Sequence, residues 1–301
     1  MTTTTASPAD STRSSSARIT YSRYDLRDLP DRWVLYLSPS DQPVTRLIVF
    51  VHGFGGKAVG TWLDFHKLDL GVRENAWWLG ADLLFVGYES TRDSITAVAN
   101  RIRSQLPRFY PTPYQPALEL NGVPLREDVT TPYSELYVVG HSLGGVVLRR
   151  ALCDSAQAWI DDGRPEQRPA LLNAQARYFS PASAGFRAAG WLGLVNASSV
   201  WAAVEAFLRR SSAYTDLQPG SPVLQDLRER TTAYVSSDES GEMAALRARI
   251  VWANPDDVVI DQNYRTDFVS ASWDGLSHQK VCKPKADTFP APWQFVQNGK
   301  A

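Results

Sequence analysis

One serine in this chain stands in surroundings that could support nucleophilic catalysis. Ser142 lies in the pentapeptide Gly140-His-Ser-Leu-Gly144, between an apolar β-type run (135–139) and a helix-compatible run (146–152). A Gly-x-Ser-x-Gly sequence between a strand and a helix is typical of a sharp turn that presents the serine hydroxyl above the edge of a sheet. The backbone of such a turn is strained, and the two glycines avoid side chains that would collide there. We therefore predict that Ser142 is a nucleophile held at the positive end of a helix.

A serine hydroxyl needs a base that takes its proton during attack, and the chain has four histidines. His52 belongs to a glycine loop, His66 is expected on a surface loop, and His141 is expected to point away from the serine. His278 follows the last predicted strand (267–271), so its loop should lie on the same side of the sheet as Ser142. It is also the only histidine after Ser142, as the order serine, acid, histidine requires. We predict that His278 is the base.

A carboxylate is expected to orient the imidazole and to stabilise its positive charge. The predicted strand 248–253 runs into the sequence Asn-Pro-Asp-Asp-Val-Val (254–259), which places two adjacent aspartates at the carboxyl end of that strand. We favour Asp256, because its spacing to the two valines resembles the acid loop of lipases. Asp257 remains the alternative.

Attack on an ester carbonyl develops negative charge on oxygen, which backbone N–H groups commonly stabilise. Leu143, directly after the serine, would supply one N–H group. The glycine loop 52–56 (His-Gly-Phe-Gly-Gly) would supply the other, most simply from Phe54. Its glycines would let the backbone approach the substrate. The loop lacks the endings typical of phosphate-binding and dinucleotide-binding loops, which favours an oxyanion role.

These residues must be brought together by a sheet. Apolar runs without polar alternation indicate strands covered on both faces, and they occur at 46–51, 82–88, 135–140, 176–181 and 248–253. Two further strands (17–24 and 32–37) precede them, and a helical pattern covers 94–106. Strands that alternate with helices predict a mainly parallel sheet with helices on both faces.

Three segments are expected outside this sheet. Residues 1–16 are rich in serine and threonine and predict a disordered tail, which leaves one domain over 17–301. The proline-rich segment 111–132 is expected to be an exposed excursion. An insertion at about 183–245 should form a partly helical cap over the serine, since residues 200–208 place large apolar side chains on one helical face.

Composition limits the classes of function. The net charge of -1 gives no reason to expect nucleic acid or an acidic membrane surface as the partner. We find neither a signal peptide nor an apolar stretch of membrane-spanning length. Two cysteines, Cys153 and Cys282, are too few and too far apart for a disulfide framework or a metal site, which favours a cytoplasmic protein with reduced thiols. We expect no metal or organic cofactor, and the oligomeric state stays open.

The chain resembles the α/β-hydrolase superfamily, and more narrowly the lipase-like serine esterases that include GPI inositol-deacylases and triacylglycerol lipases. The likeness extends over most of residues 46–284, and its phrases are 50–56 with Thr61-Trp62, 78–90, the Ser142 turn, 216–224, and His278 with 282–284. Two departures are the sequence 179–185, where these families often have Gly-Thr-Pro-His, and Ile260, where proline is common. The resemblance implies an α/β-hydrolase fold and hydrolysis of a small-molecule or lipid-like carboxylic ester through an acyl-enzyme.

Three functions remain open at this point. The first is an esterase or lipase-like serine hydrolase, whose apolar, tryptophan-rich cap would favour a hydrophobic acyl group. The second is an acyltransferase that hands the same acyl-enzyme to an alcohol or amine. The third is a catalytically silent binding module, which usually lacks a member of the triad; here Ser142, Asp256 and His278 are all present.

Overall fold

The computed structural model describes residues 18–29, 32–62, 64–69, 75–120, 123–126, 128–187 and 212–300. The predicted tail at 1–16 and the apolar helical pattern at 200–208 lie outside the described residues. Of the predicted cap, the parts at 183–187 and 212–245 are described.

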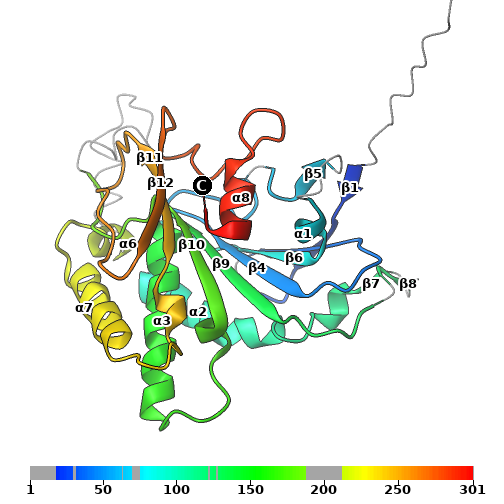
Figure 1. Cartoon of the computed structure of the whole chain (residues 1–301), viewed down its shortest axis with the longest axis horizontal. Helices are drawn as coiled ribbons and strands as arrows, with labels where there is room; N and C mark the ends of the chain where they lie inside the picture. Colours follow the sequence, from blue (N-terminus) through cyan, green and yellow to red (C-terminus); the bar gives the residue numbers. More distant parts are fainter. Residues whose placement is uncertain are drawn as a thin grey trace, which may run out of the picture.

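An eight-stranded sheet forms the centre of the molecule, in the order β12-β11-β10-β9-β4-β6-β3-β2 (Figure 1). The strands from β12 to β6 run parallel, and β3 is antiparallel to both of its neighbours. The predicted α/β-hydrolase fold with a mainly parallel sheet is therefore confirmed. The strands of this sheet are β2 (Ser22–Leu26), β3 (Trp33–Leu37), β4 (Arg46–Val51), β6 (Ala81–Val86), β9 (Glu135–His141), β10 (Ala174–Phe179), β11 (Arg249–Asn254) and β12 (Phe268–Asp274). Two small antiparallel pairs join β1 (Arg18–Thr20) to β5 (Lys67–Asp69) and β7 (Glu119–Leu120) to β8 (Val123–Pro124).

Helices cover both faces of the sheet, and β4 shows how the sequence achieves this. Leu47, Val49 and Val51 pack in one hydrophobic core, while Ile48 and Phe50 pack in the other. Helices α2, α3 and α7 contribute to the first core, and α1 and α8 contribute to the second (Figure 1). The α-helices are α1 (Asn75–Leu79), α2 (Ile95–Gln105), α3 (Leu143–Asp161), α6 (Ser212–Asp216), α7 (Pro222–Ser236) and α8 (Ala291–Asn298).

The register of the parallel strands brings their carboxyl ends to one edge. Val51 at the end of β4 lies opposite Gly140 of β9, and His141 lies opposite Phe179 at the end of β10. Phe179 in turn pairs with Val251 of β11. The loops that follow β4, β9, β10 and β11 therefore emerge side by side, which is where open α/β sheets bind ligands.

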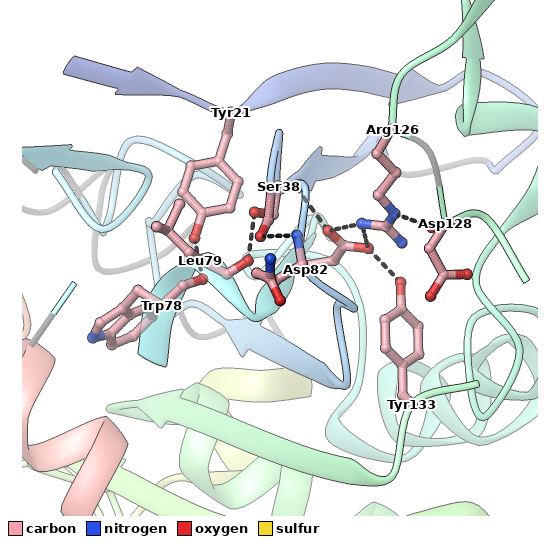
Figure 2. A network of polar contacts seen from close by, with 10 residues as sticks. Tyr21, Ser38, Trp78, Leu79, Asp82, Arg126, Asp128 and Tyr133 are labelled. Carbon is pink, nitrogen blue, oxygen red and sulfur yellow. Dashed lines mark hydrogen bonds and ion pairs between the residues drawn. The ribbon is translucent and has the colours of Figure 1, made fainter. Parts of the chain in front are cut away.

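The proline-rich segment 111–132 is exposed over much of its described length, as its composition predicts, with Val123 64% exposed, but one of its residues ties it to the sheet. Arg126 of this segment is buried and donates from Nη1 to both carboxylate oxygens of Asp82, at 3.0 Å each (Figure 2). The Tyr133 hydroxyl donates to Asp82 at 2.5 Å, and the backbone N–H of Ser38 donates at 2.8 Å. A buried carboxylate needs partners of this kind, so Asp82 on β6 draws the segment onto the sheet.

Candidate active site

Ser142 occupies a strained turn between β9 and α3. Its backbone has φ 55° and ψ -122°, and the whole residue is 3% exposed. A Cβ atom added at Gly144 would lie 1.9 Å from the carbonyl oxygen of Val51, and one at Gly140 would lie 2.7 Å from Gly145 Cα. Neither position has room for a side chain, as the sequence predicts, because strand and helix approach closely on both sides of the serine.

The glycine loop after β4 lies directly against the serine. A Cβ atom at Gly53 would stand 2.8 Å from Ser142 Cβ, so any larger residue at 53 would displace the candidate nucleophile. The N–H group of Gly55 donates to Ser90 Oγ at 2.8 Å, which anchors the loop from the neighbouring strand connection. The loop is therefore held in place before any ligand binds.

Both residues predicted to stabilise an oxyanion adjoin the serine. Phe54 lines the same pocket as Ser142, and Leu143 is the first residue of α3. The N–H groups in the first turn of a helix have no acceptor within that helix, and they carry the positive end of its dipole. The structure thus places the backbone of both residues next to Ser142.

His278 and Asp256 form a buried pair. The Nδ1–H group of His278 donates to Asp256 Oδ2 at 2.9 Å. The other carboxylate oxygen, Oδ1, accepts from the N–H groups of Val258 and Val259, at 3.0 Å each. Asp257, the alternative acid, is exposed. The structure therefore selects Asp256 as the carboxylate that contacts the histidine.

The environment of Asp256 favours its charged form. Burial opposes the charge, but the hydrogen bonds from His278 and from the N–H group of Val259 outweigh it, so the pKa of Asp256 lies below 3.8. His278 is 3% exposed, and its Nε2 atom has no hydrogen-bond partner among the described residues. In particular, it forms no hydrogen bond with the Ser142 hydroxyl. With Nδ1 protonated, Nε2 keeps a free lone pair and is available as a base. Catalytic hydrogen bonds in ligand-free sites are often long and tighten when substrate binds.

The prediction that His141 points away from the site is wrong. Its ring lies 4.8 Å from the ring of His278, and its Nε2 contacts the His278 carbonyl oxygen at 2.9 Å. Because a carbonyl only accepts, Nε2 carries the hydrogen and donates it. Burial, with repulsion from His278 when that ring is protonated and from Lys283, lowers the pKa of His141 to about 3, so the ring stays neutral. His141 thus ties the turn of Ser142 to the loop of His278.

The two remaining histidines have structural surroundings. His52 stacks on Tyr88 with ring centroids 4.2 Å apart, and the Tyr88 hydroxyl donates to the His52 carbonyl oxygen at 2.6 Å. Burial lowers the pKa of His52 to about 4. His66 is half-buried against Tyr36 rather than free on a surface loop. Neither lines the pocket that contains Ser142.

A pocket of about 440 Å³ opens onto these groups. It is lined by the glycine loop, Ser142, His141 and His278, and by two cations that we did not predict, Lys57 and Lys283.

No helix among the described residues has the length and hydropathy needed to cross a membrane. In the same part of the chain, no group of three or more histidine, cysteine or acidic residues could hold a metal ion.

Solved structures with a similar course of the chain include three lipases and esterases. The Bacillus licheniformis lipase BlEst2 is 15% identical, with 88% of this chain and 97% of that chain covered and a TM-score of 0.49. The hyperthermophilic esterase from Pyrobaculum calidifontis is 15% identical, with coverage of 92% and 82% and a TM-score of 0.44. The Paleococcus ferrophilus monoacylglycerol lipase is 13% identical, with coverage of 89% and 96% and a TM-score of 0.44.

Comparison with curated protein sequences gave no match. A sequence model of the alpha/beta hydrolase family matches residues 48–286, which include the glycine loop, Ser142, Asp256 and His278. The match covers well over half of the chain and follows the sheet from β4 through β12. This chain belongs to the alpha/beta hydrolase family.

Proposed function

We propose that this protein is a serine hydrolase that cleaves carboxylic esters through an acyl-enzyme on Ser142. The observation that carries the proposal is the buried pair of Asp256 and His278, whose free Nε2 atom borders the pocket that contains Ser142. Family membership supports the proposal, because this fold commonly presents a serine on such a turn.

In the first half of the reaction, Ser142 Oγ attacks the carbonyl carbon and passes its proton to His278 Nε2. The electron pair of the C=O π bond moves to oxygen, which the N–H groups of Phe54 and Leu143 stabilise. Asp256 holds the imidazole in the required tautomer and stabilises the imidazolium. When the oxyanion collapses, the alcohol leaves with the proton from Nε2, and the acyl group stays on Ser142.

In the second half, a water molecule takes the place of the alcohol. It gives a proton to Nε2 as its oxygen bonds to the acyl carbon, and the collapse of this second oxyanion returns the proton to Ser142 Oγ. The free acid leaves, and the site regains its starting state. Apart from the ester and water, each step uses groups of this chain.

The acyltransferase remains the second candidate, since its first half-reaction is identical and only the acceptor differs. The narrower resemblance to GPI inositol-deacylases and triacylglycerol lipases, the cap at 183–245 and the cytoplasmic location rest on the sequence alone. They stay proposals. A catalytically silent module is disfavoured by the geometry of the Asp256–His278 pair, which a binding function does not require.

Hydrolysis of p-nitrophenyl butyrate tests the proposal. Wild-type protein should release p-nitrophenol, and Ser142→Ala should remove this activity without changing the thermal unfolding temperature. Ser277→Ala, an exposed serine in the His278 loop, is the matched control and should keep it. Unchanged activity in Ser142→Ala would refute the assignment. Adding a competing alcohol and analysing the products separates hydrolysis from acyl transfer.

A further inference from the structure

The pocket beside Ser142 carries positive charge at two points. Lys57 follows the glycine loop, and Lys283 follows the loop of His278, so the two cations enter from separate segments that meet at the site. Among the described residues that line this pocket, none is an aspartate or glutamate. Neither ammonium group forms an ion pair with a residue that the structure describes. Their charge is therefore available to a ligand.

A second and larger pocket, of about 1210 Å³, continues the positive lining. It shares Lys57 and the glycines on either side of it with the serine pocket. Its other charged lining residues are three cations and two acids: Arg23, Arg27, Arg32, Asp25 and Glu89. Over both pockets five cations thus face two acids, although the whole chain has a net charge of -1. Arg23 and Asp25 pair with each other at 2.8 Å, which leaves four cations and one acid.

This lining does not fit a plain alkyl chain. Pockets for apolar ligands are lined mainly by hydrophobic and aromatic side chains. Phe54 is the one large apolar side chain among the described residues of the serine pocket. Lysine ammonium groups donate up to three hydrogen bonds and pair with carboxylate or phosphate oxygens, and a cleft lined by one sign of charge concentrates the opposite charge.

We infer that the preferred substrates are esters that carry an anionic group, a carboxylate or a phosphate, near the scissile bond, and that Lys57 and Lys283 bind this group. The inference rests on the ester hydrolysis proposed above and adds the class of ester. It replaces the hydrophobic acyl group suggested by residues 200–208, which lie outside the described residues. The two expectations predict opposite orders of rate, so one comparison of substrates separates them.

Two matched pairs of esters test the inference. For an anion on the acyl side, p-nitrophenyl hydrogen glutarate is compared with p-nitrophenyl valerate. For an anion on the alcohol side, monobutyryl glycerol 3-phosphate is compared with monobutyrin. Rates are corrected by subtraction of the Ser142→Ala rate, which removes spontaneous hydrolysis. We expect kcat/KM to be about 5- to 25-fold higher for the anionic member of one pair, since each partly exposed charge pair contributes up to about fivefold. The pair that shows the preference identifies the side that carries the anion.

Lysine variants and salt link the preference to these residues. Lys57→Gln and Lys283→Gln should each lower the anionic-to-neutral ratio of kcat/KM about fivefold. Lys280→Gln is the matched control, because Lys280 lies in the same loop as Lys283, is exposed and lines neither pocket. It should leave the ratio unchanged. Raising the ionic strength from about 0.05 M to about 0.5 M should lower the wild-type ratio, because salt screens such charges.

The outcomes are distinguishable. If Ser142-dependent hydrolysis occurs but neither pair favours the anionic ester, the inference is wrong and the hydrolase assignment stands. A preference that survives both lysine substitutions also overturns it. If a folded sample shows no Ser142-dependent hydrolysis of any of the four esters, the proposed function and the inference fall together.

Discussion

Two buried carboxylates at opposite ends of the sheet show how similar pairs differ in purpose. Asp82 near the start of β6 is paired with Arg126, and Asp256 after the end of β11 is paired with His278. Both pairs are buried, and both acids accept further hydrogen bonds from backbone N–H groups. By burial and pairing alone, the two would be classed together.

The difference lies in what each partner does with its remaining nitrogens. The Nε of Arg126 donates to the Asp128 carbonyl oxygen at 2.9 Å, and the Tyr133 hydroxyl also donates to Asp82 Oδ2 (Figure 2). The Nε2 of His278, by contrast, is buried and unpartnered beside the Ser142 pocket. A satisfied network holds structure, whereas an unsatisfied buried atom in a pocket marks a place where chemistry can occur.

The largest effect on catalysis should follow from changing the pair of Asp256 and His278. Asp256→Asn should lower kcat for ester hydrolysis by about 10³- to 10⁴-fold, because the amide no longer fixes the tautomer of His278 or stabilises its charge. Steady-state kinetics with p-nitrophenyl butyrate measure the loss. Asp257→Asn, one residue away and exposed, is the control and should stay near wild type. The opposite order of the two variants would transfer the role to Asp257.

Changing the pair of Asp82 and Arg126 should instead lower the free energy of unfolding. Arg126→Met leaves the Asp82 charge buried with fewer partners, and removing one member of such a pair costs about 3–5 kcal/mol of unfolding free energy. Urea unfolding measures this cost. Arg108→Met, which breaks the more exposed pair with Asp28, should cost at most about 1 kcal/mol. If Arg126→Met lowered kcat per folded molecule as much as Asp256→Asn does, the contrast between the two networks would be lost.

Acid should destabilise the fold through histidines that are buried in the neutral form. Burial lowers the pKa of His141 to about 3 and that of His52 to about 4, from an ordinary 6.5. Below pH 6.5 the unfolded chain therefore binds protons that the folded protein does not, and stability falls as pH decreases toward about 4. Near pH 5 each histidine contributes about 1.4 kcal/mol per pH unit to this slope.

Replacing one of these histidines measures how much it contributes to the pH dependence of the unfolding free energy. His141→Gln should reduce the slope of unfolding free energy against pH by about 1.4 kcal/mol per unit, as measured by urea unfolding between pH 4.5 and pH 6. An unchanged slope would show that His141 takes up a proton in the folded protein as readily as in the unfolded chain.

The smallest effect should follow from losing the hydrogen bond between His141 and the carbonyl oxygen of His278. His141→Phe leaves the carbonyl oxygen of His278 without its donor, and we expect kcat to fall about tenfold with little change in KM, since a lost buried hydrogen bond costs about 1–3 kcal/mol. His141→Gln keeps an N–H donor and should recover part of the loss. Equal activity in both variants would show that the hydrogen bond does not position His278.

The sequence carries much of this arrangement because it depends on local patterns and chain order. The apolar runs predict β4, β9 and β11 to within a residue at each end, and a parallel sheet places their following loops at one edge. Strand, glycine turn and helix adjoin along the chain at Ser142. The order of serine, acid and histidine then leaves few choices, and the structure brings those residues together.

What the sequence does not reveal depends on contacts between distant segments. Asp82 and Arg126 are 44 residues apart, and no periodicity in the sequence indicates that these two side chains will form a buried ion pair. The approach of Lys57 to Lys283 and the direction of the His141 ring depend on side-chain packing at the meeting of separate loops. Helix α8 (Ala291–Asn298) is eight residues long, too short for a periodic pattern to stand out.

The central claim is that His278 activates Ser142, and labelling by a fluorophosphonate tests it most directly. The wild-type protein is treated with the probe, the labelled residue is mapped by mass spectrometry, and the labelling rate is compared with that of His278→Ala. The account predicts covalent labelling at Ser142 in the wild type and a collapse of that rate in the variant. Absence of labelling in a folded wild-type sample, or equal rates in both proteins, would contradict it.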